Sequence, residues 1–239
     1  FFDLQPKKAI INDYNEELIN VYLTIRDYPE ELIKALEIHQ QNSSEEYFYT
    51  VRAMDRDTDY GQLSDVVRAA RIIHLNKTCY NGLYRVNAAG QFNSPYGRYK
   101  SPNVFNAVTI RAMSKYLQNK NIDIRQGDYK DALKGLRRGA FVYLDPPYMP
   151  ISASSSFTGS TEGGFSYEQQ AELKNECDKL SAKNIGFLQS NSDCPEIREL
   201  YKNYRIVTVQ AKRNINSNAL KRGEINEVLI YNDLIGETK

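Results

Sequence analysis

Residues 122–148 read IDIRQGDYKDALKGLRRGAFVYLDPPY and contain the clearest strand–helix–strand pattern of the chain. Ile122–Arg125 predict a β-strand that ends in a Gly-Asp turn, and residues 129–136 predict a short helix. Phe141–Leu144 form an apolar run typical of a buried strand. A strand, a helix and a strand joined by short links make a βαβ unit, which indicates a parallel sheet.

The flanking sequence extends this α/β pattern in both directions. Ser166 followed by Gln169 is a capping-box signal for a helix that runs to about Ala182. Further strands are predicted over 8–12, 185–189, 204–210 and 225–231, and further helices over 15–27, 30–40, 62–76 and 104–118.

The middle of the chain has a different texture. Residues 79–103 are rich in Asn, Gly, Pro and Tyr and predict hairpins or loops. We therefore predict a Rossmann-like, doubly wound α/β sheet formed by residues 1–28 and 121–239. A mainly helical and hairpin-containing subdomain, residues 29–120, would be inserted into it.

Composition narrows the class of protein. A chain of 239 residues with 41% hydrophobic residues can bury a core, which argues against disorder. No apolar run approaches the ~18 residues of a membrane span, so no membrane association is expected. Three widely spaced cysteines fit neither a disulfide framework nor a metal site, and they favour the cytoplasm. The start, Phe1-Phe2-Asp3, has no signal-peptide pattern.

The net charge of +1 conceals a strong segregation of charge. Residues 68–138 hold 14 Lys and Arg but only three acids, and no acid occurs from Val66 to Ile122. Such a basic segment favours a surface that binds a polyanion such as nucleic acid. A solvated basic face, neutralised by acids nearby in space, is the alternative that the sequence leaves open.

The tetrapeptide Asp145-Pro146-Pro147-Tyr148, directly after the predicted strand, carries the strongest chemical signal. Ligands of open parallel sheets bind beyond the carboxyl ends of the strands. The Asp145 carboxylate and the Pro146 carbonyl are two adjacent acceptors, which suit an amino group with two protons. Tyr148 offers a flat face for stacking. The pattern predicts a pocket for an exocyclic amine on a planar ring, with a proline-rich turn as the alternative.

Asp-Pro-Pro-Tyr after an apolar strand resembles the amino-methyltransferases that use S-adenosylmethionine, and specifically the DNA adenine-N6 methylases. Residues 80–85 (YNGLYR) and 90–100 (GQFNSPYGRYK) are similar to the target-recognition region of the Dam and DpnM group, whose target is GATC. The resemblance covers essentially the whole chain. It implies a partner, double-stranded DNA containing GATC, and a chain that acts as a monomer without a metal.

The resemblance assigns roles to the tetrapeptide. Asp145 and the Pro146 carbonyl would hold the N6 amino group of an adenine flipped out of the duplex. Tyr148 would stack on that base, and Pro147 completes the catalytic motif. Accepting both protons frees the nitrogen lone pair for in-line attack on the sulfonium methyl, so positioning and electrostatics supply the catalysis.

Two more acids are candidate cofactor ligands. Asp13 follows the first predicted strand, where an acid usually binds ribose hydroxyls. The resemblance places Asp128, with Tyr129 beside it, near the adenine end of the cofactor, and it places Asp145 next to the cofactor as well. On spacing alone, Asp13 or Asp128 could instead cap a helix.

The recognition region has several candidate DNA contacts. Arg85 could read a guanine edge, Leu83 and Pro95 could meet a thymine methyl, and Tyr80 could wedge into the base stack with Asn81 on the orphaned thymine. Each residue alone could equally be an ordinary turn or surface residue. The predicted DNA-binding set is Tyr80, Asn81, Leu83, Arg85, Asn93, Pro95, Arg98, Tyr99 and Lys100, the last three on phosphates.

One departure from the family pattern concerns the glycine loop. Its Phe-x-Gly-x-Gly and Gly-Gly-Lys segments, which cradle the methionine half of the cofactor, are absent from the sequence. The expectation is that the chain is a fragment of a longer protein; the alternative is impaired cofactor binding. Two other functions stay open, an amino-methyltransferase acting on RNA or protein glutamine and a DNA-binding module without catalysis.

Several residues outside these motifs can also be interpreted from the sequence. The 150–165 loop could be a lid or a plain linker. Arg213 and Arg222 could contact phosphate. His39 and His74 are interpreted as structural, and Cys79 lacks a nearby base and is not interpreted as a nucleophile.

Overall fold

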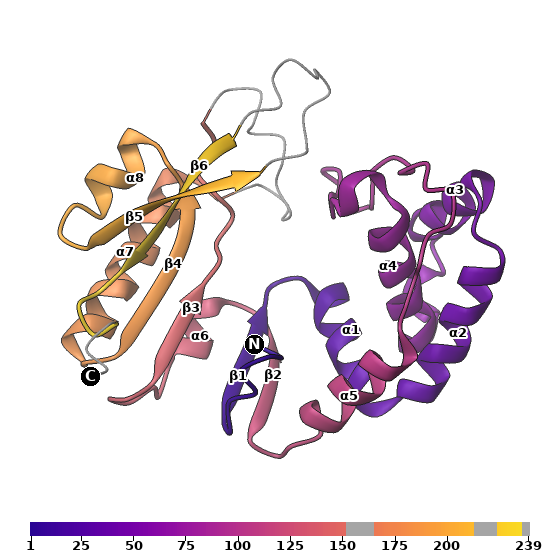
Figure 1. The fold of residues 1–239 in the computed structure, drawn as a ribbon, viewed down its shortest axis with the longest axis horizontal. Coiled ribbons are helices and arrows are strands. Elements are labelled where there is room, and N and C mark those ends of the chain that lie inside the picture. The colour runs from indigo at the N-terminus through magenta and orange to yellow at the C-terminus, as the bar shows by residue number, and fades with distance from the viewer. Residues whose placement is uncertain (152–164, 213–223, 236–239) are drawn as a thin grey trace. The chain divides into compact units, whose positions relative to one another are not determined.

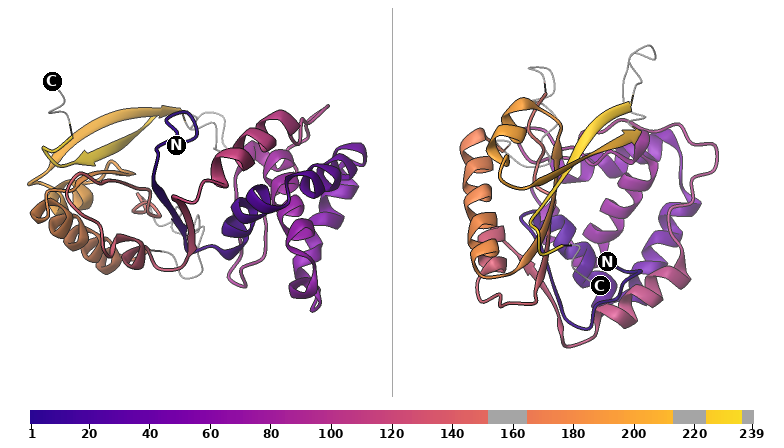
Figure 2. Two further views of the ribbon diagram at one scale, coloured as in Figure 1. Left: turned by 90° about the horizontal axis from the view of Figure 1, so that it is seen from below. Right: turned by 60° about the vertical axis from the view of Figure 1, so that its left-hand side comes forward.

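The computed structural model describes residues 1–151, 165–212 and 224–235 (Figures 1 and 2). The chain divides into two compact units, Phe1–Leu133 and Lys134–Lys239. The predicted lid over 150–165 lies almost wholly outside the described residues, and so do Arg213 and Arg222.

The first unit is mainly helical and contains two strands. Asn15, Ser44, Ser64 and Asn106 cap four of its helices by accepting backbone N–H groups of the first turn. Its elements in chain order are β1 (Ala9–Asp13), α1 (Glu16–Asp27), α2 (Pro29–Gln41), α3 (Glu45–Ala53), η1 (Met54–Arg56), η2 (Tyr60–Gln62), α4 (Asp65–Thr78), η3 (Tyr80–Gly82), α5 (Ala107–Leu117), β2 (Ile122–Gln126) and α6 (Tyr129–Leu133).

Strands β1 and β2 pair in parallel, with Ala9 opposite Ile122 and Asp13 opposite Gln126. A core of fully buried side chains, among them Leu32, Leu36 and Ala69, joins the helices to these strands. A second cluster lies under the recognition region and contains Phe48, Val51, Leu75, Cys79 and Phe92. Burial of both clusters supplies the main stabilising free energy of this unit.

The second unit is a mixed sheet with two helices. Its elements are β3 (Phe141–Leu144), α7 (Tyr167–Ala182), β4 (Gly186–Ser192), α8 (Pro195–Leu200), β5 (Arg205–Lys212) and β6 (Glu224–Tyr231). The strand order is β3-β4-β6-β5. β3 and β4 are parallel, joined through α7, whereas β6 runs antiparallel to β4 and β5. Figure 1 shows α7 running alongside β4.

Most predicted elements are present with shifted ends. The capping box is confirmed, since Ser166 accepts the Gln169 N–H and the Gln169 side chain accepts the Ser166 N–H. Helices α3 and α8 were not predicted. The region 79–103 contains only isolated bridges, Cys79 with Tyr96 and Val86 with Phe92, and the short helix η3.

The sheet predictions need two corrections. The two strands of the expected βαβ unit, β2 and β3, are not hydrogen-bonded to each other, because β2 pairs with β1 and β3 pairs with β4. The sheet is mixed, not wholly parallel, because β6 lies antiparallel between β4 and β5. Link length predicts that two strands can be parallel neighbours, but it does not choose the neighbour.

The described residues contain neither a membrane-spanning helix nor a cluster of metal-binding side chains. None of their helices is both long and apolar enough to cross a membrane. They also contain no group of three or more His, Cys, Asp or Glu placed to hold a metal ion. Cys79, Cys177 and Cys194 are buried free thiols, and burial raises the pKa of Cys79 to about 11.

Candidate active site and nucleic-acid interface

The loop Asp145–Tyr148 begins where β3 ends, beside the carboxyl end of the parallel strand β4. Leu144 lies opposite Gln189, so the next residue of β4, Ser190, lies near Asp145. The Ser190 hydroxyl donates a 2.7 Å hydrogen bond to Asp145 Oδ1. Asp145 itself is exposed, so its carboxylate is fixed by one oxygen and accessible to a ligand.

The backbone of this loop is held by two fully buried amide side chains, Gln170 and Asn191. Gln170 Nε2 donates to the Pro147 carbonyl over 3.0 Å. Asn191 Oδ1 accepts the Met149 N–H, also over 3.0 Å. The Pro146 carbonyl accepts no hydrogen bond from the described residues, so it is the proline acceptor left for a ligand.

Tyr148 is half-buried, and its hydroxyl donates a long, 3.4 Å hydrogen bond to Glu227 of β6. Burial raises the pKa of Tyr148 to about 12. The nearby charges of Glu227 and Asp145 add to this rise, whereas a hydrogen bond with Ser190 lowers the pKa. The ring therefore stays neutral at physiological pH and is anchored at its polar end, as a stacking surface requires.

In the first unit, Asp13 and Asp128 lie at the same edge of the β1–β2 pair. The Gly127 N–H donates to the Asp13 carbonyl, and Asn12 Nδ2 donates to the Gly127 carbonyl, both over 3.0 Å. These bonds tie the two strand ends together. The structure thus brings Asp13 and Asp128, predicted from separate parts of the sequence, to adjacent loops.

The helix-cap alternative applies differently to the two acids. Asn15, not Asp13, caps α1, and Asp13 Oδ1 accepts the Asn15 N–H over 2.7 Å. Asp128 Oδ1 accepts the Lys130 N–H over 2.8 Å at the start of α6, so Asp128 does have a capping role. Each carboxylate keeps its Oδ2 without a partner among the described residues. Two such acceptors suit hydroxyl or amino donors, which fits the donors of a nucleoside-containing cofactor.

Tyr129 follows Asp128 and is half-buried. The Lys130 ammonium lies 5.9 Å from the centre of its ring. Nearby, burial raises the pKa of Tyr22, and the Asp13 carboxylate adds to this rise. The edge formed by Asp13 and Asp128 is thus lined by aromatic side chains as well as acids.

The predicted recognition residues occupy one connected segment of the first unit. The Tyr80 N–H donates to the Pro95 carbonyl over 2.8 Å. Asn81 is exposed in the left-handed conformation, with φ 55°. Pro95, Arg98, Tyr99 and Lys100 are also exposed, whereas Tyr80, Leu83, Arg85 and Asn93 are half-buried.

Arg85 is tied to Asn93 across this segment. Arg85 Nε donates to Asn93 Oδ1 over 2.7 Å, and the Asn93 N–H donates to the Arg85 carbonyl over 2.9 Å. The Ser94 hydroxyl also donates to the Leu83 carbonyl. These bonds hold Arg85 in a fixed orientation, which lowers the entropic cost of using its remaining donors on a ligand.

A buried ion pair beneath this segment was not predicted. The Arg71 side chain is 2% exposed and pairs with Asp55 at 2.7 Å. Asp55 Oδ2 accepts the Phe92 N–H over 2.8 Å, which fixes the strand-like part of the recognition segment to α4. The signal in the sequence was Arg71 on the apolar face of a predicted helix.

The acid-free stretch divides into paired and unpaired cations. Arg68, Arg71 and Arg111 pair with Glu17, Asp55 and Glu30, at 2.6, 2.7 and 2.7 Å. For these three, the alternative of acids nearby in space is correct. Arg85, Arg98 and Lys100, which lie within the segment 80–100, have no carboxylate partner among the described residues, and neither does Lys77 just before it.

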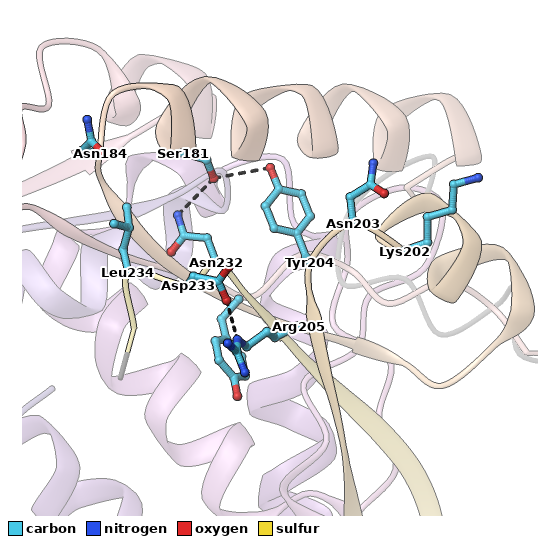
Figure 3. Close-up of a pocket in the computed structure, with 10 residues that line it drawn as sticks. Ser181, Asn184, Lys202, Asn203, Tyr204, Arg205, Asn232, Asp233 and Leu234 are labelled. Atoms are coloured by element: carbon cyan, nitrogen blue, oxygen red, sulfur yellow. Dashed lines mark hydrogen bonds and ion pairs between the residues drawn. The ribbon is translucent and has the colours of Figure 1, made fainter. Parts of the chain in front are cut away.

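A separate cleft of about 470 Å³ lies at the opposite end of the second unit's sheet from Asp145 (Figure 3). Its central polar groups bond to one another. Asn232 Nδ2 donates to Ser181 Oγ over 3.0 Å, and Arg205 pairs with Asp233. This cleft contains none of the predicted site residues.

The mixed α/β fold, with Asp-Pro-Pro-Tyr at the end of a parallel strand, is consistent with that of a methyltransferase. Residues 1–215 match the D12 class N6 adenine-specific DNA methyltransferases, and the chain belongs to this family. It is therefore an adenine-specific DNA methyltransferase.

Curated relatives cover nearly the whole chain. The type II methyltransferase M1.LlaDCHI of Lactococcus lactis subsp. cremoris is 45% identical over 97% of this chain and 82% of its own length. The type II methyltransferase M.MjaIII of Methanocaldococcus jannaschii is 38% identical over 95% and 80%. The DNA adenine methylase of Escherichia coli (strain K12) is 31% identical over 96% and 81%.

Proposed function

We propose that this enzyme transfers a methyl group from S-adenosylmethionine to N6 of an adenine flipped out of duplex DNA, at GATC. The observation that carries the proposal is the pair of accessible acceptors at the end of β3. The Asp145 carboxylate has one oxygen fixed by Ser190, and the Pro146 carbonyl has no donor among the described residues.

These acceptors fit the chemistry of an aromatic amine. The N6 lone pair is delocalised into the adenine ring, so the amine is a poor nucleophile. Hydrogen bonds from its two protons to Asp145 and Pro146 favour a tetrahedral nitrogen and localise the lone pair. The sulfonium cofactor supplies a methyl group already activated by positive charge. As the N–C bond forms and the S–C bond to the sulfonium breaks, leaving a neutral thioether, Asp145 would accept the proton that the nitrogen loses.

The Tyr148 ring would stack on the flipped base and hold the amino group against the two acceptors. Stacking restricts rotation of the base, and positioning of this kind lowers the entropic part of the barrier. Pro147 contributes by fixing the backbone between Pro146 and Tyr148, since its carbonyl is bound by Gln170.

The first unit offers acceptors for the cofactor. Asp13 Oδ2 and Asp128 Oδ2 would accept from its ribose hydroxyls and adenine amine, with Tyr129 beside the adenine. The family resemblance adds Asp145 as a further cofactor contact. We propose accordingly that residues 1–28 and 121–239 make the cofactor-binding domain and residues 29–120 the recognition domain, in a cytoplasmic monomer.

DNA contact is assigned to the segment 80–100. Arg85, oriented by Asn93, would read a guanine edge, and Leu83 and Pro95 would meet a thymine methyl. Tyr80 and Asn81 would replace the flipped adenine in the stack. Arg98, Tyr99 and Lys100 are exposed and would bind phosphates, which positions the segment without reading sequence.

Transfer of labelled methyl from S-adenosylmethionine to duplex DNA tests the proposal. The comparison uses a GATC duplex, the same duplex with that site scrambled, and the Asp145→Ala protein. Label on adenine N6, only with GATC and only with Asp145 intact, is the expected result. Transfer to RNA or to a glutamine peptide instead would contradict the assignment of DNA. GATC binding without transfer, even at saturating cofactor, would indicate a recognition protein that has lost catalysis.

A further inference from the structure

Gln170 and Asn191 form a buried polar pair that joins α7 to β4. Both residues are 0% exposed, and Asn191 Nδ2 donates to Gln170 Oε1 over 3.0 Å. Their remaining polar atoms reach the loop on either side of Tyr148. Gln170 donates to the Pro147 carbonyl, and Asn191 accepts the Met149 N–H.

Burial of two amides requires an explanation, because an unsatisfied buried amide destabilises the folded state. Here, Asn191 Oδ1 also accepts the Ser192 N–H over 2.9 Å, so the pair is richly bonded. Gln189, two residues before Asn191 on the same strand, is also 0% exposed. Its Nε2 has no partner among the described residues, and its side chain makes no hydrogen bond to residues 145–149. Burial alone therefore does not account for the loop contacts of Gln170 and Asn191.

The prolines give these contacts a consequence for the site. Neither Pro146 nor Pro147 has an N–H, so this stretch of backbone can be fixed only through its carbonyls. Gln170 takes the Pro147 carbonyl, and the Pro146 carbonyl stays available. The buried pair thereby determines which of two adjacent proline carbonyls faces a ligand.

We propose that Gln170 and Asn191 are positioning residues that hold the Pro146 carbonyl and the Tyr148 ring in the geometry for an exocyclic amine. The identity of that amine, adenine N6, rests on the proposed function. The immobilisation of the loop does not, so the two can be tested separately.

The immobilisation can be measured without catalysis. The chain has no tryptophan, so the Tyr148→Trp substitution introduces a single indole into the loop. Its quenching by acrylamide is compared in three proteins: Tyr148→Trp alone, with Gln170→Met added, and with Gln189→Met added. Loss of the loop contacts is expected to raise the quenching constant about twofold through local opening. The Gln189→Met control removes an equally buried amide and is expected to leave quenching unchanged.

Activity is measured with Tyr148 intact. Gln170→Met and Asn191→Leu are expected to lower kcat about tenfold or more, with KM for the cofactor unchanged, because the lost interaction positions the amine and not the cofactor. Gln189→Met is expected to keep wild-type kcat. Gln170→Glu provides a conservative rescue, because its carboxyl can donate to Pro147 only when protonated. Its kcat relative to wild type should therefore rise as the pH falls.

The possible results separate the two ideas. Equal quenching and equal kcat in the Gln170→Met and Gln189→Met proteins would overturn the positioning role. A quenching difference together with a wild-type protein that transfers no methyl to adenine would support the positioning role and contradict the proposed reaction. If Gln170→Met unfolds the second unit, the isosteric Gln170→Glu protein decides, and a kcat ratio independent of pH would overturn the proposal.

Discussion

The Ser190 hydroxyl donates a 2.7 Å hydrogen bond to the Asp145 carboxylate, so β4 orients the acid that follows β3. Side chains alternate along a strand, and β4 uses both of its faces. Ser190 lies on the face of Asp145 and Tyr143, while Asn191 lies on the face of α7 and holds the loop backbone. One strand thus bonds both the Asp145 carboxylate and the loop backbone at Met149.

The Ser190→Ala substitution is expected to lower kcat about tenfold, because a hydrogen bond to a charged group contributes about 1.5–3 kcal/mol and orients the acceptor. KM for S-adenosylmethionine is expected to change less than kcat, because Ser190 makes no hydrogen bond to Asp13 or Asp128 among the described residues. Steady-state kinetics of methyl transfer provide the measurement. Tyr143→Phe is the control, because the Tyr143 hydroxyl makes only a 3.4 Å contact with Ser190. An equal loss in both proteins would contradict a specific role for Ser190.

The Asp55→Ala substitution is expected to destabilise the first unit by about 3 kcal/mol, because it leaves the buried Arg71 charge without its partner. The Asp55 side chain is 10% exposed and also accepts the Phe92 N–H, so the recognition segment loses an anchor as well. Hydrogen exchange of backbone amides in the first unit, measured at increasing urea concentration, gives the change in its stability. Glu30→Ala breaks the exposed pair with Arg111 and should leave stability almost unchanged.

Gly97→Ala is expected to weaken DNA binding about tenfold through displacement of the recognition segment. A Cβ at this position would lie 2.8 Å from the Cys79 carbonyl oxygen and would collide with the Tyr99 ring. Because the Cys79 carbonyl belongs to the backbone, the exposed Tyr99 ring must move, and Tyr99 is a proposed phosphate contact. Fluorescence anisotropy with a labelled GATC duplex measures the affinity. Gly61→Ala is the control, since a Cβ there meets nothing within 4 Å; equal affinities of the two variants would contradict the argument.

Local signals predicted most of the elements and the chemical motif. The capping box at Ser166 is a contact between near neighbours in sequence, so the sequence contains all the information needed to find it. The tetrapeptide after β3 and the acids after β1 and β2 were predictable for the same reason. The residue that follows a strand is its neighbour in sequence, so predicting the strand also locates that residue.

The supporting residues depend on pairings that no local pattern specifies. Ser190 lies near Asp145 only because Gln189 is paired with Leu144, and this register is set by the whole sheet. Residues 189–192 (QSNS) did carry a signal in the sequence, because four polar residues directly follow the apolar residues of a predicted strand. The structure includes all four in β4 and buries them. Arg71 was similarly visible as a cation in an apolar helix, but its partner Asp55 lies in a region that the sequence left unassigned.

Stability is expected to fall as the pH drops from about 6.5 toward 4, because His39 and His74 are buried neutral in the first unit. Their rings stack with centroids 4.8 Å apart, and the Tyr47 hydroxyl contacts His39 Nδ1 at 2.9 Å. Burial lowers the pKa of each histidine to about 4, and the neighbouring His39 adds to the effect on His74. A group whose folded pKa is depressed in this way protonates first in the unfolded chain, so acid favours unfolding.

The two residues are the only histidines of the chain, which makes the test selective. Between about pH 7 and pH 5, the free energy of unfolding of wild type should fall by about 3 kcal/mol more than that of a His39→Gln, His74→Leu double variant. Carboxylates titrate in both proteins and cancel in the comparison. Urea unfolding at a series of pH values gives both curves. Parallel curves would mean that the stacked pair is hydrated or already charged in the native protein, which would contradict its burial as a neutral pair.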